Sequence, residues 1–233
     1  MKRVCAVLLL AVITTIVSAS PITGLLERID KGASKKFIIE EVKSDTDFFE
    51  LDQKGSRVVI RGNNSVSIAT GLNWYLKYYA GIHLSWNGMT ATLPDVLPPV
   101  MKKERHETKL PWRYDLNYCT YSYSMAFWDW ERWEKEIDWM ALHGINLPLV
   151  ITGTETVWYN VLQKLGYNKT EIDEFISGPG FFAWWLMNNL EGWGGPNPDH
   201  WYTQQVSLQK KILKRMHEYG IEPVLPGYCG MVP

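Results

Sequence analysis

The segment HGINLPLVITG, residues 143–153, decides how this chain is interpreted, because a similar segment, YGIEPVLPGYCG, returns at residues 219–230. Each segment reads as a helix end, a glycine, an isoleucine, a short apolar run and an exit loop that contains glycine. A nearly all-apolar strand such as 145–151 is typical of parallel sheets that are buried on both faces. The repeat predicts that one helix-to-strand joint is used twice, before strands at 145–151 and 221–225.

Helical patterns lie between and around these two strands. Asp129 is placed to cap a helix that Gly144 ends, and a candidate strand at 113–120 precedes it. The apolar face of that helix would carry Trp130, Trp133, Ile137 and Met140. Further helices are expected at 154–165, 170–176 and 180–190, with a long one between Pro198 and Gly220. Alternating strands and helices imply a parallel sheet, and therefore an α/β fold.

The type of parallel sheet follows from the loops. Long loops after the strands favour a (β/α)8 TIM barrel, and no GxGxxG motif follows the first strand to indicate a dinucleotide site. A TIM barrel has eight strands, whereas three are visible before Pro233. We therefore expect residues 106–233 to form the first three βα units of an incomplete barrel. The chain would then be the N-terminal piece of a longer protein.

Residues 20–105 are expected to form a small N-terminal α+β domain. Strand patterns occur at 36–40, 48–52 and 57–61, followed by a helical pattern over 68–79 that Gly81 closes. Several prolines and a largely charged run at 102–109 then have the composition of a linker. This places the domain boundary near residue 105.

The first 19 residues have the pattern of a secretory signal peptide. Lys2 and Arg3 precede a mostly apolar run of fourteen residues, 4–17, which is too short to span a bilayer. Small residues at Val17 and Ala19 place the cleavage after Ala19. We expect the mature chain to be exported, to a periplasm, the cell exterior or a lysosome according to the organism. No later apolar run is long enough for a membrane span.

Composition excludes several classes of partner. The net charge is −1 and no basic run occurs, which argues against nucleic acid and anionic membranes as partners. The five histidines show no metal-ligand spacing, so neither a metal nor another cofactor is expected. Only Cys119 and Cys229 follow the signal peptide, too few for a disulfide scaffold.

An aromatic stretch, NYCTYSYSMAFWDWERW at 117–133, follows the candidate first strand, and seven of its seventeen residues are aromatic. In TIM barrels the functional residues lie at the C-terminal ends of the strands. The first strand would present Asn117, Cys119, Tyr121 and Tyr123 there. The second would present 152–155, and the third Tyr228 and Cys229. Aromatic rings suit the C–H faces of a sugar, while amides and hydroxyls suit its hydroxyl groups. The lining therefore indicates a carbohydrate site.

Individual residues of this lining keep alternative interpretations. Asn117 and Tyr123 are the stronger candidates for ligand contact. Cys119 alone also fits a buried packing residue. Glu155 fits a catalytic carboxylate, a salt-bridge partner or a residue of the first helical turn.

Three segments give a more specific resemblance. They are RYDLNYCTYSYSMAFWDWERWEKEIDWMALHGINLPLVITGTETVW (113–158), GPGFFAWWLMNNLEGWGGP (178–196) and GIEPVLPGYCGMVP (220–233). Together they resemble the start of the catalytic barrel of glycoside hydrolase family 89, the α-N-acetylglucosaminidases, and residues 21–105 resemble that family's N-terminal domain more loosely. The resemblance implies an exo-acting hydrolase whose substrate is a glycan with terminal α-linked N-acetylglucosamine.

The resemblance also implies roles for single residues. Asn117 and Cys119 match positions that meet the sugar hydroxyls, Tyr123 matches a pocket tyrosine, and Trp184 matches a tryptophan that lines the sugar site. Glu136 matches a glutamate that we interpret as structural. The family retains anomeric configuration with two glutamates, about 5 Å apart in such enzymes. Both would come from later strands, so this chain is expected to carry no catalytic residue.

Two other functions remain open from the sequence. The chain could belong to a non-catalytic carbohydrate-binding protein, or to another retaining barrel hexosaminidase.

Overall fold

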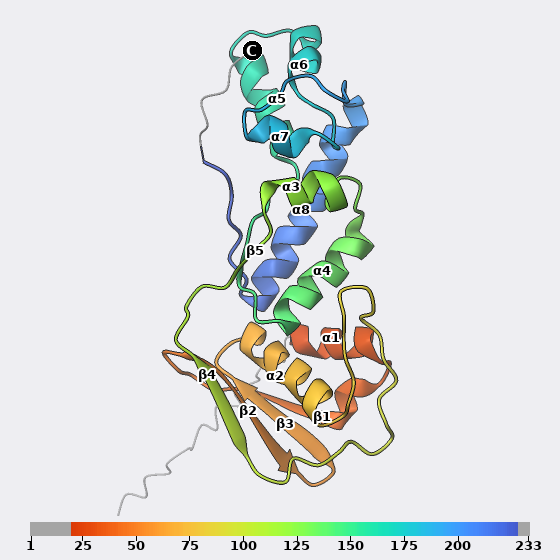
Figure 1. The fold of residues 1–233 in the computed structure, drawn as a ribbon, viewed down its shortest axis with the longest axis vertical. Helices are drawn as coiled ribbons and strands as arrows, with labels where there is room; N and C mark the ends of the chain where they lie inside the picture. Colours follow the sequence, from red (N-terminus) through yellow and green to blue (C-terminus); the bar gives the residue numbers. More distant parts are fainter. Residues whose placement is uncertain (1–19, 228–233) are drawn as a thin grey trace, which may run out of the picture.

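The structure is a computed structural model that describes residues 20–227. A sheet-based unit and a mainly helical unit are stacked along the long axis of the molecule (Figure 1). The predicted signal peptide, residues 1–19, and the predicted strand-end residues Tyr228 and Cys229 lie outside the described residues. Within the described part, no helix combines the length and the apolar character that crossing a membrane requires.

The N-terminal unit is a four-stranded sheet covered by helices. Its elements are α1 (Pro21–Ile29), η1 (Ala33–Lys36), β1 (Phe37–Glu41), β2 (Asp47–Lys54), β3 (Arg57–Gly62), α2 (Ser65–Tyr78) and β4 (Glu104–Thr108). The strand order is β1-β3-β2-β4, with β1 parallel to β3 and the other pairs antiparallel. The predicted three strands and the long helix are thus confirmed, and α1 was not anticipated.

The prediction of a linker over 102–109 is wrong, because this segment contains β4. The strand pairs with β2, so that Phe49 lies opposite His106 and Phe48 lies opposite Glu107. The Arg105 guanidinium lies 3.5 Å from the centre of the Phe48 ring. Charged side chains are a usual feature of edge strands because they discourage pairing with other chains. The charged composition therefore marks a sheet edge, and the proposed boundary near residue 105 falls within this strand.

The second unit contains the predicted alternation of short strands and helices. Its elements are β5 (Tyr114–Asp115), α3 (Tyr118–Thr120), the π-helical turn η2 (Tyr121–Met125), α4 (Trp130–Leu142), β6 (Leu147–Pro148), α5 (Thr154–Lys164), α6 (Lys169–Phe175), α7 (Phe182–Leu186) and α8 (Asp199–Tyr219). Asp129 caps α4 as predicted, and its side chain accepts a hydrogen bond of 2.9 Å from the Arg132 backbone N–H.

Three parallel segments lie side by side in the order expected for successive barrel strands. β5 pairs with β6, and Leu149 forms a parallel bridge with Val224. The pairing is shorter than the predicted runs. The first strand ends at Asp115, because Leu116 has a φ of +70° and the Asn117 side chain caps the helical turn that follows. The extension of that strand to residue 120 is therefore wrong.

The repeated helix-to-strand joint is confirmed in atomic detail. After α4, the Ile145 N–H donates to the Met140 carbonyl at 3.0 Å; after α8, the Ile221 N–H donates to the Met216 carbonyl at 2.9 Å. A glycine precedes the isoleucine in each joint, and its φ is +77° at Gly144 and +75° at Gly220. Both are Schellman endings, in which a left-handed residue closes the helix and turns the chain into the next strand.

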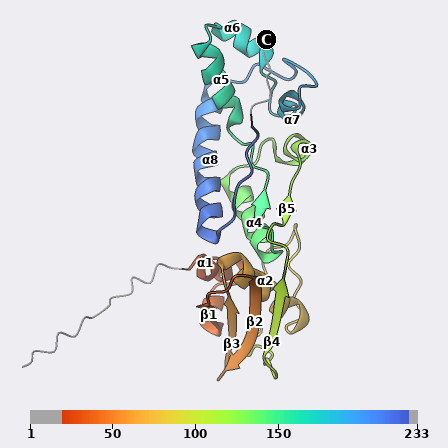
Figure 2. The same cartoon turned by 90° about the vertical axis from the view of Figure 1, so that its left-hand side faces the viewer.

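The two units are joined by buried polar contacts. Arg28 of α1 donates two hydrogen bonds to Asp138 of α4, at 2.6 and 2.8 Å, and Tyr219 of α8 donates to the same carboxylate at 2.8 Å. Nearby, the Trp86 indole donates to Glu136 at 2.7 Å. Glu136 also pairs with Arg132 and is buried, which agrees with its predicted structural role. These contacts fix the ends of α4 and α8 that face the sheet (Figure 2).

Candidate functional site

The carboxyl ends of the three parallel segments border the largest cavity described. Its volume is about 650 Å³, within the usual range for small-molecule sites. The exit of the second strand contributes Thr152, Gly153 and Thr154, and the exit of the third contributes Leu225 and Pro226. Tyr118, rather than the predicted Asn117 or Cys119, represents the first strand there. Strand-end residues therefore meet at one site, as the barrel prediction requires.

Asn117 caps α3 and Cys119 lies within it, on either side of Tyr118, but neither of the two lines this cavity. The Asn117 side-chain oxygen accepts hydrogen bonds of 3.0 Å from the Thr120 backbone N–H and hydroxyl. Its side chain is exposed and lines a neighbouring pocket with Tyr114 and Asp115. The amide NH2 group of Asn117 is therefore the part that remains available as a donor. Cys119 is half-buried on the same short helix.

Tyr123 and Trp184, which are 61 residues apart in the sequence, come together in the structure. Their rings meet edge to face, with centroids 4.9 Å apart and an interplanar angle of 86°. Tyr123 is 79% exposed, which leaves most of its ring free. An exposed aromatic corner of this kind can hold the C–H face of a sugar.

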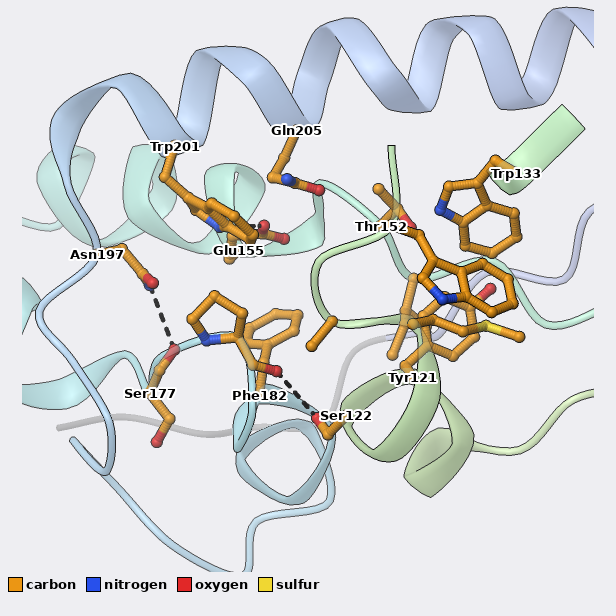
Figure 3. Close-up of a pocket in the computed structure, with 15 residues that line it drawn as sticks. Tyr121, Ser122, Trp133, Thr152, Glu155, Ser177, Phe182, Asn197, Trp201 and Gln205 are labelled. Atoms are coloured by element: carbon orange, nitrogen blue, oxygen red, sulfur yellow. Dashed lines mark hydrogen bonds between the residues drawn. The ribbon is translucent and has the colours of Figure 1, made fainter. Parts of the chain in front are cut away.

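A single hydroxyl ties the segments that carry these two rings. The Ser122 Oγ accepts a hydrogen bond of 3.0 Å from the Ala183 backbone N–H. It donates one of 3.2 Å to the Pro179 carbonyl, which Figure 3 shows as a dashed line. Ser122 belongs to η2 with Tyr123, while Ala183 belongs to α7 with Trp184. Sequence reasoning missed Ser122, because nothing in the stretch distinguishes it from the neighbouring Ser124.

Glu155 lies in the first turn of α5, as one of its three interpretations predicted. It is 5% exposed, and its carboxylate accepts a hydrogen bond of 3.0 Å from the Trp201 indole. No cation within residues 20–227 pairs with it, which excludes the salt-bridge interpretation for the described chain. Burial raises the pKa of Glu155 to about 7. The carboxyl group lines a small cavity of about 40 Å³ with Ser177 and Asn197, enough space for water (Figure 3).

The chemistry of the site is that of recognition. The large cavity is lined mainly by apolar side chains, with the rings of Tyr118 and Trp158, the Gln209 amide and the hydroxyls of Thr152 and Thr154. The buried carboxyl group of Glu155 lines the small cavity next to it, where the Trp201 indole holds it. Among residues 20–227, no cluster of histidine, cysteine or acidic side chains could hold a metal ion. The lining suits a polar ligand with apolar faces, such as a sugar ring.

Solved structures with the same fold are glycoside hydrolases. A family 89 enzyme from Clostridium perfringens in complex with 2-acetamido-1,2-dideoxynojirmycin is 43% identical, with a TM-score of 0.86 over 91% of this chain and 25% of that one. Another structure from that organism, in complex with its substrate GlcNAc-alpha-1,4-galactose, has the same identity and TM-score and is covered over 24% of its length. The fold is therefore that of the TIM-barrel part of these family 89 structures.

The family follows from the sequence comparisons. The profile of the alpha-N-acetylglucosaminidase (NAGLU) TIM-barrel domain matches residues 113–233, and that of the corresponding N-terminal domain matches residues 20–99. The chain belongs to the alpha-N-acetylglucosaminidase family. It is 45% identical to the human alpha-N-acetylglucosaminidase over 192 residues, which are 82% of this chain and 26% of the human one. The chain thus spans about a quarter of the length of the relatives it matches.

Proposed function

We propose that this chain is part of an exo-acting glycoside hydrolase that removes terminal α-linked N-acetylglucosamine from glycans. The contact between Tyr123 and Trp184 is the observation that carries the proposal, because it forms an exposed aromatic corner. Neither ring lines the large cavity itself, but Tyr118 and Leu186, which lie close to them in the sequence, do. The clostridial relative, which is described with GlcNAc-alpha-1,4-galactose as its substrate, supports this choice of sugar.

In this proposal the described residues bind and orient the sugar. Tyr123 and Trp184 take its apolar face, and Asn117 and Cys119 meet its hydroxyl groups. Cleavage would retain anomeric configuration, with one glutamate attacking the anomeric carbon and a second protonating the leaving oxygen and later activating water. We place both glutamates beyond residue 233, in the part of the family's barrel that has no counterpart here.

The test compares the 233-residue chain with the product of its contiguous coding sequence beyond codon 233. On a chromogenic α-N-acetylglucosaminide the longer product is expected to turn over and the 233-residue chain is not. Turnover by the shorter chain would refute our placement of the glutamates. A longer product that binds the sugar without cleaving it would instead support a carbohydrate-binding protein.

Residue roles are tested in the longer product. Tyr123→Ala and Trp184→Ala are each expected to lower kcat/KM by roughly tenfold, since one aromatic contact contributes up to about 1.5 kcal/mol. Trp112→Ala, a change at a 57% exposed tryptophan that precedes β5 at the opposite end of the barrel segment, is the matched control. An equal loss of kcat/KM in all three variants would contradict a specific role of the Tyr123–Trp184 pair in binding the sugar.

We also propose that the mature chain begins after Ala19 and is exported. The basic pair and the apolar run of residues 2–17 support this. N-terminal sequencing of the protein recovered from its native host tests it. An intact Met1 on the recovered protein would contradict the proposed cleavage.

A further inference from the structure

A second groove lies between the segment leading into α4 and the first turns of α8. Its volume is about 340 Å³. One wall carries Phe127 and Trp130, and the other carries Trp201, Gln204, Gln205 and Lys211. None of these residues lines the large cavity at the strand ends. The groove is therefore separate from the large cavity, and it shares Trp201 and Gln205 with the small one.

The aromatic rings around this groove differ in how much of their faces other side chains cover. The Arg132 guanidinium lies 3.9 Å from the centre of the Trp128 ring, and Arg215 lies 5.6 Å from that of Trp130. Such cation–π contacts cover a ring face. Phe127 is 75% exposed, and its ring meets Trp201 at a centroid distance of 6.1 Å and an angle of 70°. Phe127 and Trp201 are thus the rings that can accept a ligand.

Trp201 is held in place by the buried carboxyl group of Glu155. The indole N–H donates to Glu155 at 3.0 Å, and this contact lies on the inner side, toward the small polar cavity (Figure 3). The same tryptophan lines the outer groove. A ring that is fixed before binding loses little side-chain entropy when a ligand stacks on it. This gives the buried Glu155 a role that the sugar site does not use.

The polar side chains of the groove define the chemistry of its occupant. Gln204 and Gln205 offer amide donors and acceptors, Lys211 offers an ammonium group and Asp129 a carboxylate. An amphipathic helix would need a continuous apolar groove, whereas here polar groups alternate with two rings. Aromatic faces flanked by amides suit a pyranose ring, and the opposite charges of Lys211 and Asp129 favour a neutral one.

We propose that this groove is a second carbohydrate-binding site, which holds one uncharged pyranose unit of a glycan on Phe127 and Trp201. The choice of a glycan rests on the proposed function. Phe127 follows shortly after η2, which carries Tyr123, so both sites are presented by the same loop. A glycan held in the groove would raise the local concentration of its other ends near the first site.

The two sites can be observed separately by their indole signals. In the 233-residue chain, GlcNAc-alpha-1,4-galactose is titrated while the indole N–H resonances are followed by NMR, with Trp201→Phe and Trp184→Phe identifying the signals. We expect saturable shifts of the Trp201 resonance. Phe127→Ala is expected to weaken this response roughly tenfold, by loss of one aromatic contact. Because Phe127 is exposed, its truncation leaves the fold intact. The control variant Trp193→Ala should leave the Trp201 response unchanged.

The outcomes separate this proposal from the proposed function. A Trp184 shift without a Trp201 shift overturns the second site and leaves the first one standing. A Trp201 shift that persists in Phe127→Ala at the original affinity also overturns the groove as described. A Trp201 shift alone supports the second site and removes the support for the first, and silence of both signals refutes both.

Discussion

The two ends of the barrel segment are built in opposite ways. At the end that faces the N-terminal sheet, α4 and α8 close in the same Schellman ending, and Asp138 receives three hydrogen bonds from Arg28 and Tyr219. At the other end, Leu116 adopts a φ of +70° and Tyr123 is 79% exposed. The buried Asp138 carboxylate is fully paired at the first end, whereas backbone strain and an exposed ring mark the second.

This difference shows that the residues that stabilise the fold and the residues available for binding lie at opposite ends of the barrel segment. In TIM barrels the N-terminal face of the strands serves stability and the C-terminal face carries function. At the functional end, the buried Ser177 hydroxyl and Trp185 indole N–H find no hydrogen-bond partner within residues 20–227. Changes at the first end should therefore act mainly on the free energy of unfolding, and changes at the second mainly on pH response and ligand affinity.

The largest effect is expected for Asp138→Ala at the sheet-facing end. The change leaves the half-buried Arg28 guanidinium without its main partner and should lower the free energy of unfolding by about 4 kcal/mol. Urea unfolding measures this loss. Glu131→Ala, which removes an exposed pair with Lys135 on the same helix, is the control and should cost below about 0.5 kcal/mol. Similar losses for both variants would mean that the buried network does not join the units.

A pH-dependent effect is expected for Glu155 at the functional end. Its pKa rises from 4.5 to about 7 on burial, so the unfolded chain loses this proton at lower pH than the folded chain. The associated stability is complete below pH 4.5 and decreases as the pH rises to about 7, by about 3 kcal/mol in all. Glu155→Gln stays neutral and should lack this decrease. Denaturant unfolding at several pH values compares the two proteins, and parallel curves would contradict the shift.

A smaller effect is expected at the repeated joint. Gly144→Ala and Gly220→Ala each force a residue with a side chain into the left-handed region, at a cost of about 1–2 kcal/mol. Gly144 should be the more sensitive position, because an added Cβ would lie 3.3 Å from the Thr70 hydroxyl, whereas around Gly220 no described atom lies within 4 Å. Thermal unfolding ranks the two variants. A larger loss of stability for Gly220→Ala than for Gly144→Ala would contradict the expected effect of the Thr70 contact.

The smallest effect on stability, with a separate effect on binding, is expected for Ser122→Ala. Losing the contacts to Ala183 and Pro179 should cost about 1 kcal/mol of unfolding free energy. It should also weaken the response of the Trp184 indole resonance to GlcNAc-alpha-1,4-galactose, because α7 loses its tie to η2. Ser122→Thr keeps the hydroxyl and should restore the response, and Ser124→Ala at an exposed neighbouring position should not alter it. A full response in Ser122→Ala would exclude a positioning role.

The sequence predicted best what rests on local chemistry. The Asp129 cap and the two glycine-terminated helices are encoded by short patterns, and the structure contains them. The apolar runs at 145–151 and 221–225 pair over fewer residues than predicted. β4 was mistaken for a linker because its charges reflect an edge position, which depends on distant pairing with β2. The strand predicted over 113–120 was too long, because aromatic residues favour strands until a cap such as Asn117 starts a helical turn.

The candidate site was predictable only in part. The sequence, with the family resemblance, named Tyr123 and Trp184, and the structure places their rings in contact. Nothing in the sequence signals that Ser122 ties their two segments, or that Glu155 holds Trp201, since both contacts join residues more than forty positions apart. Long-range hydrogen bonds between single polar side chains leave no periodic trace.

The recurring glycine–isoleucine connection has a practical consequence for protein engineering. Because each copy is defined by its own backbone hydrogen bonds, it can serve as a splice point at which one βα unit is exchanged for that of a relative. Chimeras cut at Gly144 or Gly220 would keep the incoming strand in register, which offers a route to grafting new loops onto this scaffold.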